Sequence, residues 1–93
     1  MHKIIAIGEV EDLLKWEQGF QTHGALFKRQ TVASPIHFAT EGDGNQVAVL
    51  FEASDLDEYL KGLDSPDTAE AMAYDGVKRD TVKFFVLDKT FRF

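Results

Sequence analysis

The side chains best suited to acid–base chemistry in this sequence are three histidines, His2, His23 and His37. A histidine accepts or releases a proton near neutral pH, so one that faces a pocket is a candidate base. His37 stands beside Phe38 in an extended segment, and we predict it as the first candidate for a proton acceptor in a pocket. His23 is the second candidate, because it follows Trp16 by seven residues and would share its helical face.

Each histidine also has a structural interpretation. At the end of a helix, the positive form of His23 would stabilise the negative end of the helix dipole, and His37 would be a residue of a surface or edge strand. The spacing of the three histidines matches no local metal-ligand motif, so we predict no metal. The sequence contains no Cys, which excludes thiolate catalysis and Cys-ligated centres, and we predict no cofactor.

Large apolar side chains could form the walls of a pocket for a small apolar ligand between helices and sheet. The predicted ligand-contacting residues are Trp16, Phe20, Phe38, Tyr59 and Met72. Tyr59 would add a hydroxyl group that needs a hydrogen-bond partner when it is buried. The same residue types at helical spacing are typical of a hydrophobic core, so the sequence leaves both interpretations open.

The elements that would position these residues follow from hydrophobic periodicity and turn signals. Strands are predicted over residues 3–8, 46–53 and 81–87, with an extended segment over 28–40 and a hairpin-type loop over 41–45. Helices are predicted over 11–23, 54–63 and 65–76. We expect Gly24 to end the first helix, Ser65 and Pro66 to begin the last, and Gly76 to cap it.

This order of elements predicts a single α+β domain over residues 1–93, with a βαββαβ arrangement and a four-stranded antiparallel sheet. The helices would cover one face of the sheet. Both alternating sides of the strands are apolar at residues 4–7 and 82–87, whereas a sheet with one wet face should alternate apolar and polar residues. We therefore expect a second copy of the chain to cover the other face, as a homodimer.

Composition narrows the range of partners. The chain has 93 residues and a net charge of −6, which would repel nucleic acid on average. Its longest apolar runs are far shorter than the roughly 20 residues that cross a bilayer. The N-terminal segment shows no signal-peptide pattern. We therefore expect a cytoplasmic protein that binds neither nucleic acid nor membrane.

Three stretches of the sequence resemble the dimeric α/β-barrel superfamily of small ferredoxin-like proteins, which includes the antibiotic-biosynthesis monooxygenases. They are residues 10–16, which resemble the opening of its first helix, residues 43–52, its loop and third strand, and residues 65–72, the start of its later helix. The resemblance implies two sheets that meet face to face as a barrel, with the helices outside. The haem-degrading branch has an Asn on the first strand, and residues 3–8 contain none.

Two functions are compatible with these observations. The first, which the absence of a recognisable catalytic set favours, is a homodimeric ligand-binding, structural or regulatory module. The alternative is a cofactor-independent monooxygenase- or isomerase-like enzyme for a small apolar or aromatic substrate, with His37 or His23 as the base. A deep pocket reached by one of these histidines would favour the enzyme, and a filled core would favour the module.

Overall fold

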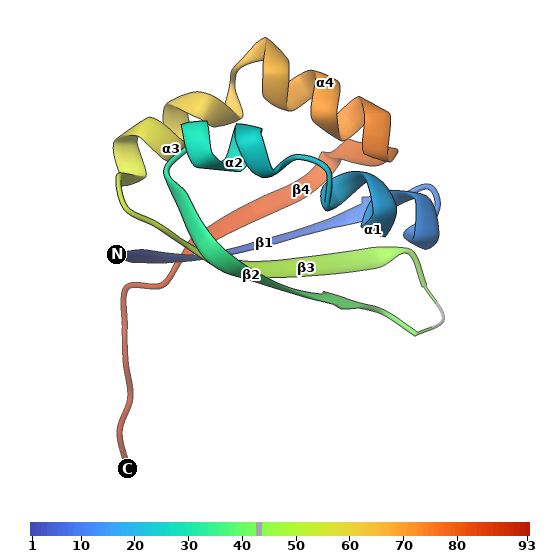
Figure 1. Ribbon diagram of the computed structural model, residues 1–93. Coiled ribbons are helices and arrows are strands. Elements are labelled where there is room, and N and C mark those ends of the chain that lie inside the picture. The colour runs from blue at the N-terminus through green and yellow to red at the C-terminus, as the bar shows by residue number, and fades with distance from the viewer. Residues whose placement is uncertain (43) are drawn as a thin grey trace.

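A computed structural model describes residues 1–42 and 44–93, with Ser34 described by its backbone alone. The elements, in chain order, are β1 (His2–Val10), α1 (Leu13–Phe20), α2 (Gly24–Arg29), β2 (Val32–Thr40), β3 (Gln46–Ala53), α3 (Leu56–Leu63), α4 (Pro66–Asp75) and β4 (Val77–Val86). The four strands form one antiparallel sheet in the order β2-β3-β1-β4. All four helices lie on one face of it (Figure 1). The predicted α+β ferredoxin-like fold is therefore confirmed.

The helices begin and end at residues that suit those positions. Asp12 and Asp55 cap α1 and α3, since each side chain accepts a hydrogen bond from the backbone N–H three residues later. Ser65 caps α4 in the same way, and Pro66 occupies its first turn. Gly76 ends α4 with a φ of 74°, in the left-handed region that favours glycine. The predicted signals at both ends of the last helix are confirmed.

The predicted helix over residues 11–23 is wrong in its length. The chain forms two helices instead, and Gly24 begins α2 rather than ending the first helix. After α1 the chain turns, and the Thr22 hydroxyl donates to the Gly19 carbonyl at 2.6 Å, satisfying an acceptor at the helix end. The extended segment predicted from residue 28 begins only at Val32, because α2 continues to Arg29.

The strands follow the sequence prediction to different degrees. β3 has the predicted bounds, while β4 begins four residues earlier than predicted, at Val77. The hairpin loop predicted over 41–45 includes Asp43, which lies outside the described residues. The break predicted at Pro35 is confirmed as a shift in the β2–β3 register between Ala33 and His37.

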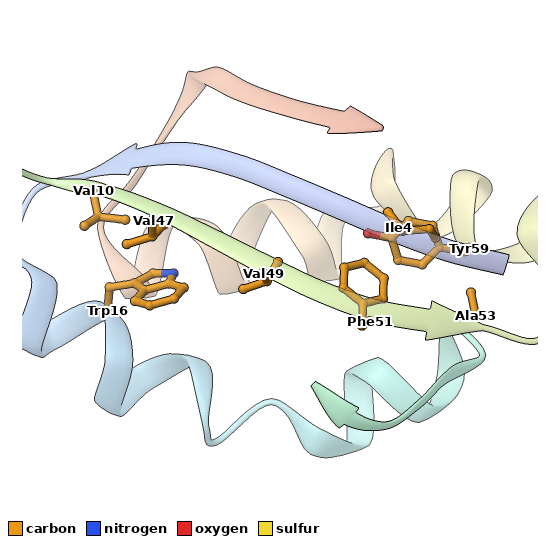
Figure 2. Packing of buried hydrophobic residues seen from close by; sticks show 8 residues of the cluster. All are labelled: Ile4, Val10, Trp16, Val47, Val49, Phe51, Ala53 and Tyr59. Atoms are coloured by element: carbon orange, nitrogen blue, oxygen red, sulfur yellow. The ribbon is translucent and has the colours of Figure 1, made fainter. Parts of the chain in front are cut away.

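The hydrophobic core lies between the helices and the sheet (Figure 2). Its buried apolar residues are Ile4, Val10, Trp16, Val47, Val49, Phe51, Ala53 and Tyr59. The strand residues in this set alternate along β1 and β3, so they all point toward the helices. The core is therefore built from one face of the sheet only.

The opposite face of the sheet is apolar in part, with Lys83 beside Ile7 on it. A row of side chains crosses all four strands in register, from His37 through Leu50 and Ile5 to Phe85. Leu50 and Phe85 are exposed, Phe85 at 52% of its surface. Lys3 pairs with Glu52 at the margin of this row. We call this row, together with its neighbours Ile7 and Leu87, the outer face.

The C-terminal segment, residues 87–93, leaves the sheet after β4 and extends away from the domain, on the side opposite the helices (Figure 1). The rings of Phe91 and Phe93 are exposed and stack on each other with centroids 5.9 Å apart. The two rings therefore do not pack on the chain's own core.

Within the described part of the chain, no helix combines the length and apolar character needed to cross a membrane.

Candidate functional site

A cavity of about 130 Å³ lies between the helical layer and the sheet. Every helix and strand contributes to its wall, which is mainly aliphatic and aromatic. An engineered apolar cavity of about 150 Å³ in another protein stays dry and binds benzene, so a space of this size suits a ligand of about one aromatic ring. The core is therefore not completely filled by its own side chains.

The structure brings five of the seven predicted site residues together around this cavity. They are Trp16, Phe20, His23, Tyr59 and Met72. These residues come from α1, from α3 and α4, and from the turn before α2. These five residues thus share one cavity wall, and their roles in binding or catalysis stay predictions.

The two remaining candidates, both on β2, lie elsewhere. Phe38 contacts Trp16 edge-on, with ring centroids 5.8 Å apart, and borders a neighbouring hollow between α1, α2 and β2. Because successive strand residues point to opposite faces, His37 lies on the outer face, paired with Leu50. His37, the first candidate base in the sequence, therefore does not line this cavity.

His23 has a carboxylate partner that the sequence analysis did not identify. Its Nε2 lies 3.0 Å from Oδ2 and 3.1 Å from Oδ1 of Asp75. The Asp75 side chain is 4% exposed and that of His23 is 17% exposed, and both residues line the cavity. When the carboxylate accepts the Nε2–H hydrogen bond, Nδ1 of the neutral ring is left as its proton acceptor.

Two glycines allow this pair to form. Gly19 lies where α1 crosses α4, and a Cβ at this position would overlap the Asp75 carboxylate. Asp75 is the last residue of α4, and Gly76 turns the chain into β4 directly after it. His23 occupies the turn that separates α1 from α2. The absence of a side chain at Gly19 thus brings segments that are 52 residues apart into hydrogen-bond contact.

Asp75 could have been identified from one local signal. A carboxylate in the last turn of a helix lies at the negative end of the helix dipole, where it is unfavourable. Asp75 stands directly before the glycine that caps α4. An acidic residue in such a position needs a compensating partner, although the sequence does not indicate which residue supplies it.

The buried position of Asp75 changes its ionisation. Burial raises the pKa of the Asp75 carboxyl above its ordinary value, because a charge is poorly solvated there. The hydrogen bond from His23, its charge and the charge of Lys15 oppose this effect without cancelling it. The carboxyl therefore holds a proton to a higher pH in the folded chain than in the unfolded chain.

This shift predicts how stability depends on pH. Between the ordinary pKa of Asp75 and its raised value, the folded chain binds more protons than the unfolded chain, so the free energy of unfolding falls as pH rises. Asp75→Asn should remove this component. Urea denaturation at several pH values from about 3.5 upward should show wild type losing stability relative to Asp75→Asn.

Asp88→Asn, in the exposed tail, controls for the removal of one carboxylate. A wild type that gains stability relative to Asp75→Asn over this range would contradict the assignment, because it would mean that the folded chain favours the charged carboxylate.

A second polar cluster in the cavity wall is satisfied within the protein. Gln30 donates from Nε2 to the Thr68 hydroxyl at 2.6 Å and to the Gly62 carbonyl at 3.3 Å. The Thr68 hydroxyl donates to the same carbonyl at 2.6 Å. Both side chains are buried. These hydrogen bonds link α2, α3 and α4, and the polar groups of the cluster pair with one another.

Tyr59 is, with Thr68, a buried hydroxyl-bearing residue of the cavity wall. Its ring packs on Phe51 with centroids 5.3 Å apart. Burial raises the pKa of the Tyr59 hydroxyl far above its ordinary value, so the group stays protonated and can donate a hydrogen bond. Among the described residues, no group of three or more His, Asp or Glu side chains is arranged to hold a metal ion.

No protein-family model matches this sequence, and comparison with curated proteins finds no match either. Several solved structures share the fold across almost the whole chain. SnoaB, a cofactor-independent oxygenase from Streptomyces nogalater, matches with a TM-score of 0.69 and 17% identity, covering 98% of this chain and 94% of that chain. A Bordetella bronchiseptica protein assigned to the antibiotic biosynthesis monooxygenases matches with a TM-score of 0.74 and 13% identity, covering 97% of both chains.

A further antibiotic biosynthesis monooxygenase has a TM-score of 0.68 and 8% identity, over 97% of this chain and 99% of that chain. The resemblance stated from the sequence is thus confirmed, since these neighbours are ferredoxin-fold proteins of the antibiotic-biosynthesis-monooxygenase type. At these identities the likeness shows the fold alone.

Proposed function

We propose that this chain is a cofactor-independent oxygenase that acts on a small, uncharged phenol bound in the cavity. The observation that carries the proposal is the His23–Asp75 pair in the wall of a mainly apolar cavity. A pocket reached by a histidine is the outcome that favours an enzyme over a purely structural module. The fold shared with SnoaB, a cofactor-independent oxygenase, supports the same reaction class.

In the proposed reaction, His23 accepts the hydroxyl proton of the phenol, and Asp75 stabilises the resulting imidazolium. The electron-rich phenolate passes one electron to O₂, and the two radicals combine to form a C–O bond at a ring carbon. The peroxide takes the proton back from His23. The distal oxygen, this proton and the ring hydrogen then leave as water, which gives a quinone. One phenol and one O₂ thus yield one quinone and one water.

The apolar wall has two roles in this scheme. It excludes bulk water, which strengthens the interaction between the imidazolium and the carboxylate. It also holds an aromatic ring by contact with aromatic side chains such as Phe20, whose ring lies 5.2 Å from that of Trp16. The substrate supplies the electrons, so the protein's contribution is orientation and one proton acceptor.

The test is oxygen uptake with a panel of uncharged one-ring phenols, with quinone formation followed by absorbance. His23→Ala should lower turnover by about 10²–10⁴-fold, the usual contribution of a general base. The change also leaves the buried Asp75 carboxylate without its partner, so turnover is compared at a temperature where circular dichroism shows both proteins folded. His2→Ala is the matched control, because it removes an exposed imidazole at the start of β1.

Activity that survives in His23→Ala but disappears in His37→Ala would place the base on the other face of the sheet and refute the assignment. Quinone formation by neither variant nor wild type would refute the oxygenase proposal itself.

We also propose that the protein is a homodimer in which two outer faces pack together. In the row from His37 to Phe85, the apolar side chains of Leu50 and Phe85 are exposed and that of Ile5 is half-buried. Burying such a face is favourable in proportion to the apolar area removed from water. A stable interface of this kind should bury more than about 1,000 Å² in total.

A further inference from the structure

Two hydrogen-bond donors in the cavity wall have no acceptor among the residues that the structure describes. The Trp16 indole and the Tyr59 phenol are 3% and 4% exposed. Among the described residues, neither the Trp16 Nε1–H nor the Tyr59 hydroxyl makes a hydrogen bond. Every described side-chain nitrogen or oxygen that is fully inaccessible has a hydrogen-bond partner. Both polar atoms must therefore reach accessible space. Both residues line the cavity, so we assign that space to the cavity.

The orientation of the two side chains agrees with this conclusion. In Figure 2, the nitrogen edge of Trp16 turns toward β3, and the Tyr59 oxygen points from its ring toward the middle of the core. Trp16 lies at the end of the core near Val10 and Val47, and Tyr59 lies at the end near Ile4 and Ala53. The two donors thus lie toward opposite ends of the core.

Buried donors of this kind are normally paired in proteins. The Gln30–Thr68 cluster shows that the chain satisfies other polar groups in the same wall. An indole N–H can only donate, and the raised pKa of Tyr59 keeps its hydroxyl able to donate. Each of the two groups therefore requires an acceptor oxygen, which a ligand in the cavity can supply.

We infer that Trp16 and Tyr59 are specificity-determining hydrogen-bond donors for a one-ring, uncharged aromatic ligand with an oxygen at each end of the ring. The inference rests on the proposed function, because it concerns the ligand of the same cavity. A 1,4-quinone has this arrangement, with one oxygen from the phenol and one added by the reaction. A hydrocarbon leaves both donors unpaired, and an anionic ligand is repelled by the Asp75 carboxylate in the wall.

Three probes of nearly equal shape separate these cases: hydroquinone, p-xylene and 4-hydroxybenzoate. Their dissociation constants are measured by calorimetry without oxygen, so that no turnover occurs. Hydroquinone should bind wild type more than tenfold more tightly than p-xylene, a difference that corresponds to one or two net hydrogen bonds. It should also bind more than tenfold more tightly than 4-hydroxybenzoate, whose carboxylate is repelled by Asp75. Trp16 is the single tryptophan of the chain, so its indole N–H resonance is unambiguous. It should move further downfield with hydroquinone, which accepts a hydrogen bond, than with p-xylene, which acts on it through ring current alone.

Tyr59→Phe removes the hydroxyl while keeping the ring that packs in the core. It should weaken hydroquinone binding by about 5- to 10-fold and leave p-xylene binding unchanged. Tyr74→Phe is the matched control, since the Tyr74 side chain is exposed on α4 and does not line the cavity. It should change neither constant.

Equal affinity for hydroquinone and p-xylene, or an unchanged hydroquinone constant in Tyr59→Phe, would overturn the inference. These outcomes are separate from a failure of the oxygenase proposal. A protein that binds hydroquinone through Tyr59 but consumes no O₂ with phenols would refute the reaction and leave the donors' role intact. Oxygen uptake by wild type, with no effect of Tyr59→Phe on hydroquinone binding, would support the reaction and refute the role of the donors.

Discussion

Replacing Trp16 with alanine should lower the free energy of unfolding by about 3–5 kcal/mol, the cost of removing a large buried aromatic side chain. The ring is 3% exposed and contacts both Phe20 and Phe38. Its removal would join the existing cavity to the space that the indole occupies. Chemical denaturation monitored by circular dichroism measures the change, since the variant lacks the chain's single tryptophan.

Leu14→Ala is the matched control on the same helix, because the Leu14 side chain is 64% exposed. Its free energy of unfolding should stay within about 0.5 kcal/mol of wild type. A loss below about 1 kcal/mol in Trp16→Ala would mean that the indole contributes little to the core and serves mainly as a wall of the ligand site.

Replacing Phe85 with lysine should raise the dissociation constant of the proposed dimer by about a thousandfold. Phe85 ends the apolar row of the outer face, and its ring is half exposed in the single chain. In a two-fold symmetric interface both copies carry the change, and replacing a large aromatic contact with a charge costs about 2 kcal/mol or more per copy. Sedimentation at micromolar concentration reports the constant.

Leu60→Lys is the control for this experiment, because Leu60 is an exposed apolar residue of α3, in the helical layer. It introduces the same charge on the other side of the molecule and should leave the dimer intact. A wild-type chain that sediments as a monomer at these concentrations would contradict the proposed dimer directly.

The sequence predicted most reliably the elements whose signals are local. Residues 46–53 lie between two turn signals, with side chains that alternate between the two sides of a strand, and β3 has these bounds. Ser65 and Pro66 mark the start of α4 and Gly76 its end. The break between α1 and α2 was missed because the apolar stripe from Leu13 to Phe27 continues through it. The start of β4 was missed because its first residues are polar, as is possible for an outer strand with solvent beside it.

The candidate site shows a similar division. Helical spacing correctly placed Trp16 and His23 on one side of the chain, even though a turn separates them. His37 was assigned to the pocket because the sequence does not determine which face of β2 points inward, and a shift of one residue reverses the faces. The contact between His23 and Asp75 depends on the crossing of α1 over α4 at Gly19, which local patterns do not encode.

The strand order also bears on aggregation. β2 and β4 form the two edges of the sheet, and an unpaired edge can recruit a strand from another molecule. Pro35 lacks an N–H group and lies where the β2 register shifts, while β4 carries Lys78, Arg79 and Asp80 as exposed residues near its start. Charges, proline and irregular register all oppose edge-to-edge growth into fibres. Copies of this chain should therefore meet through the apolar outer face, in pairs of limited size, rather than through open-ended addition of strands.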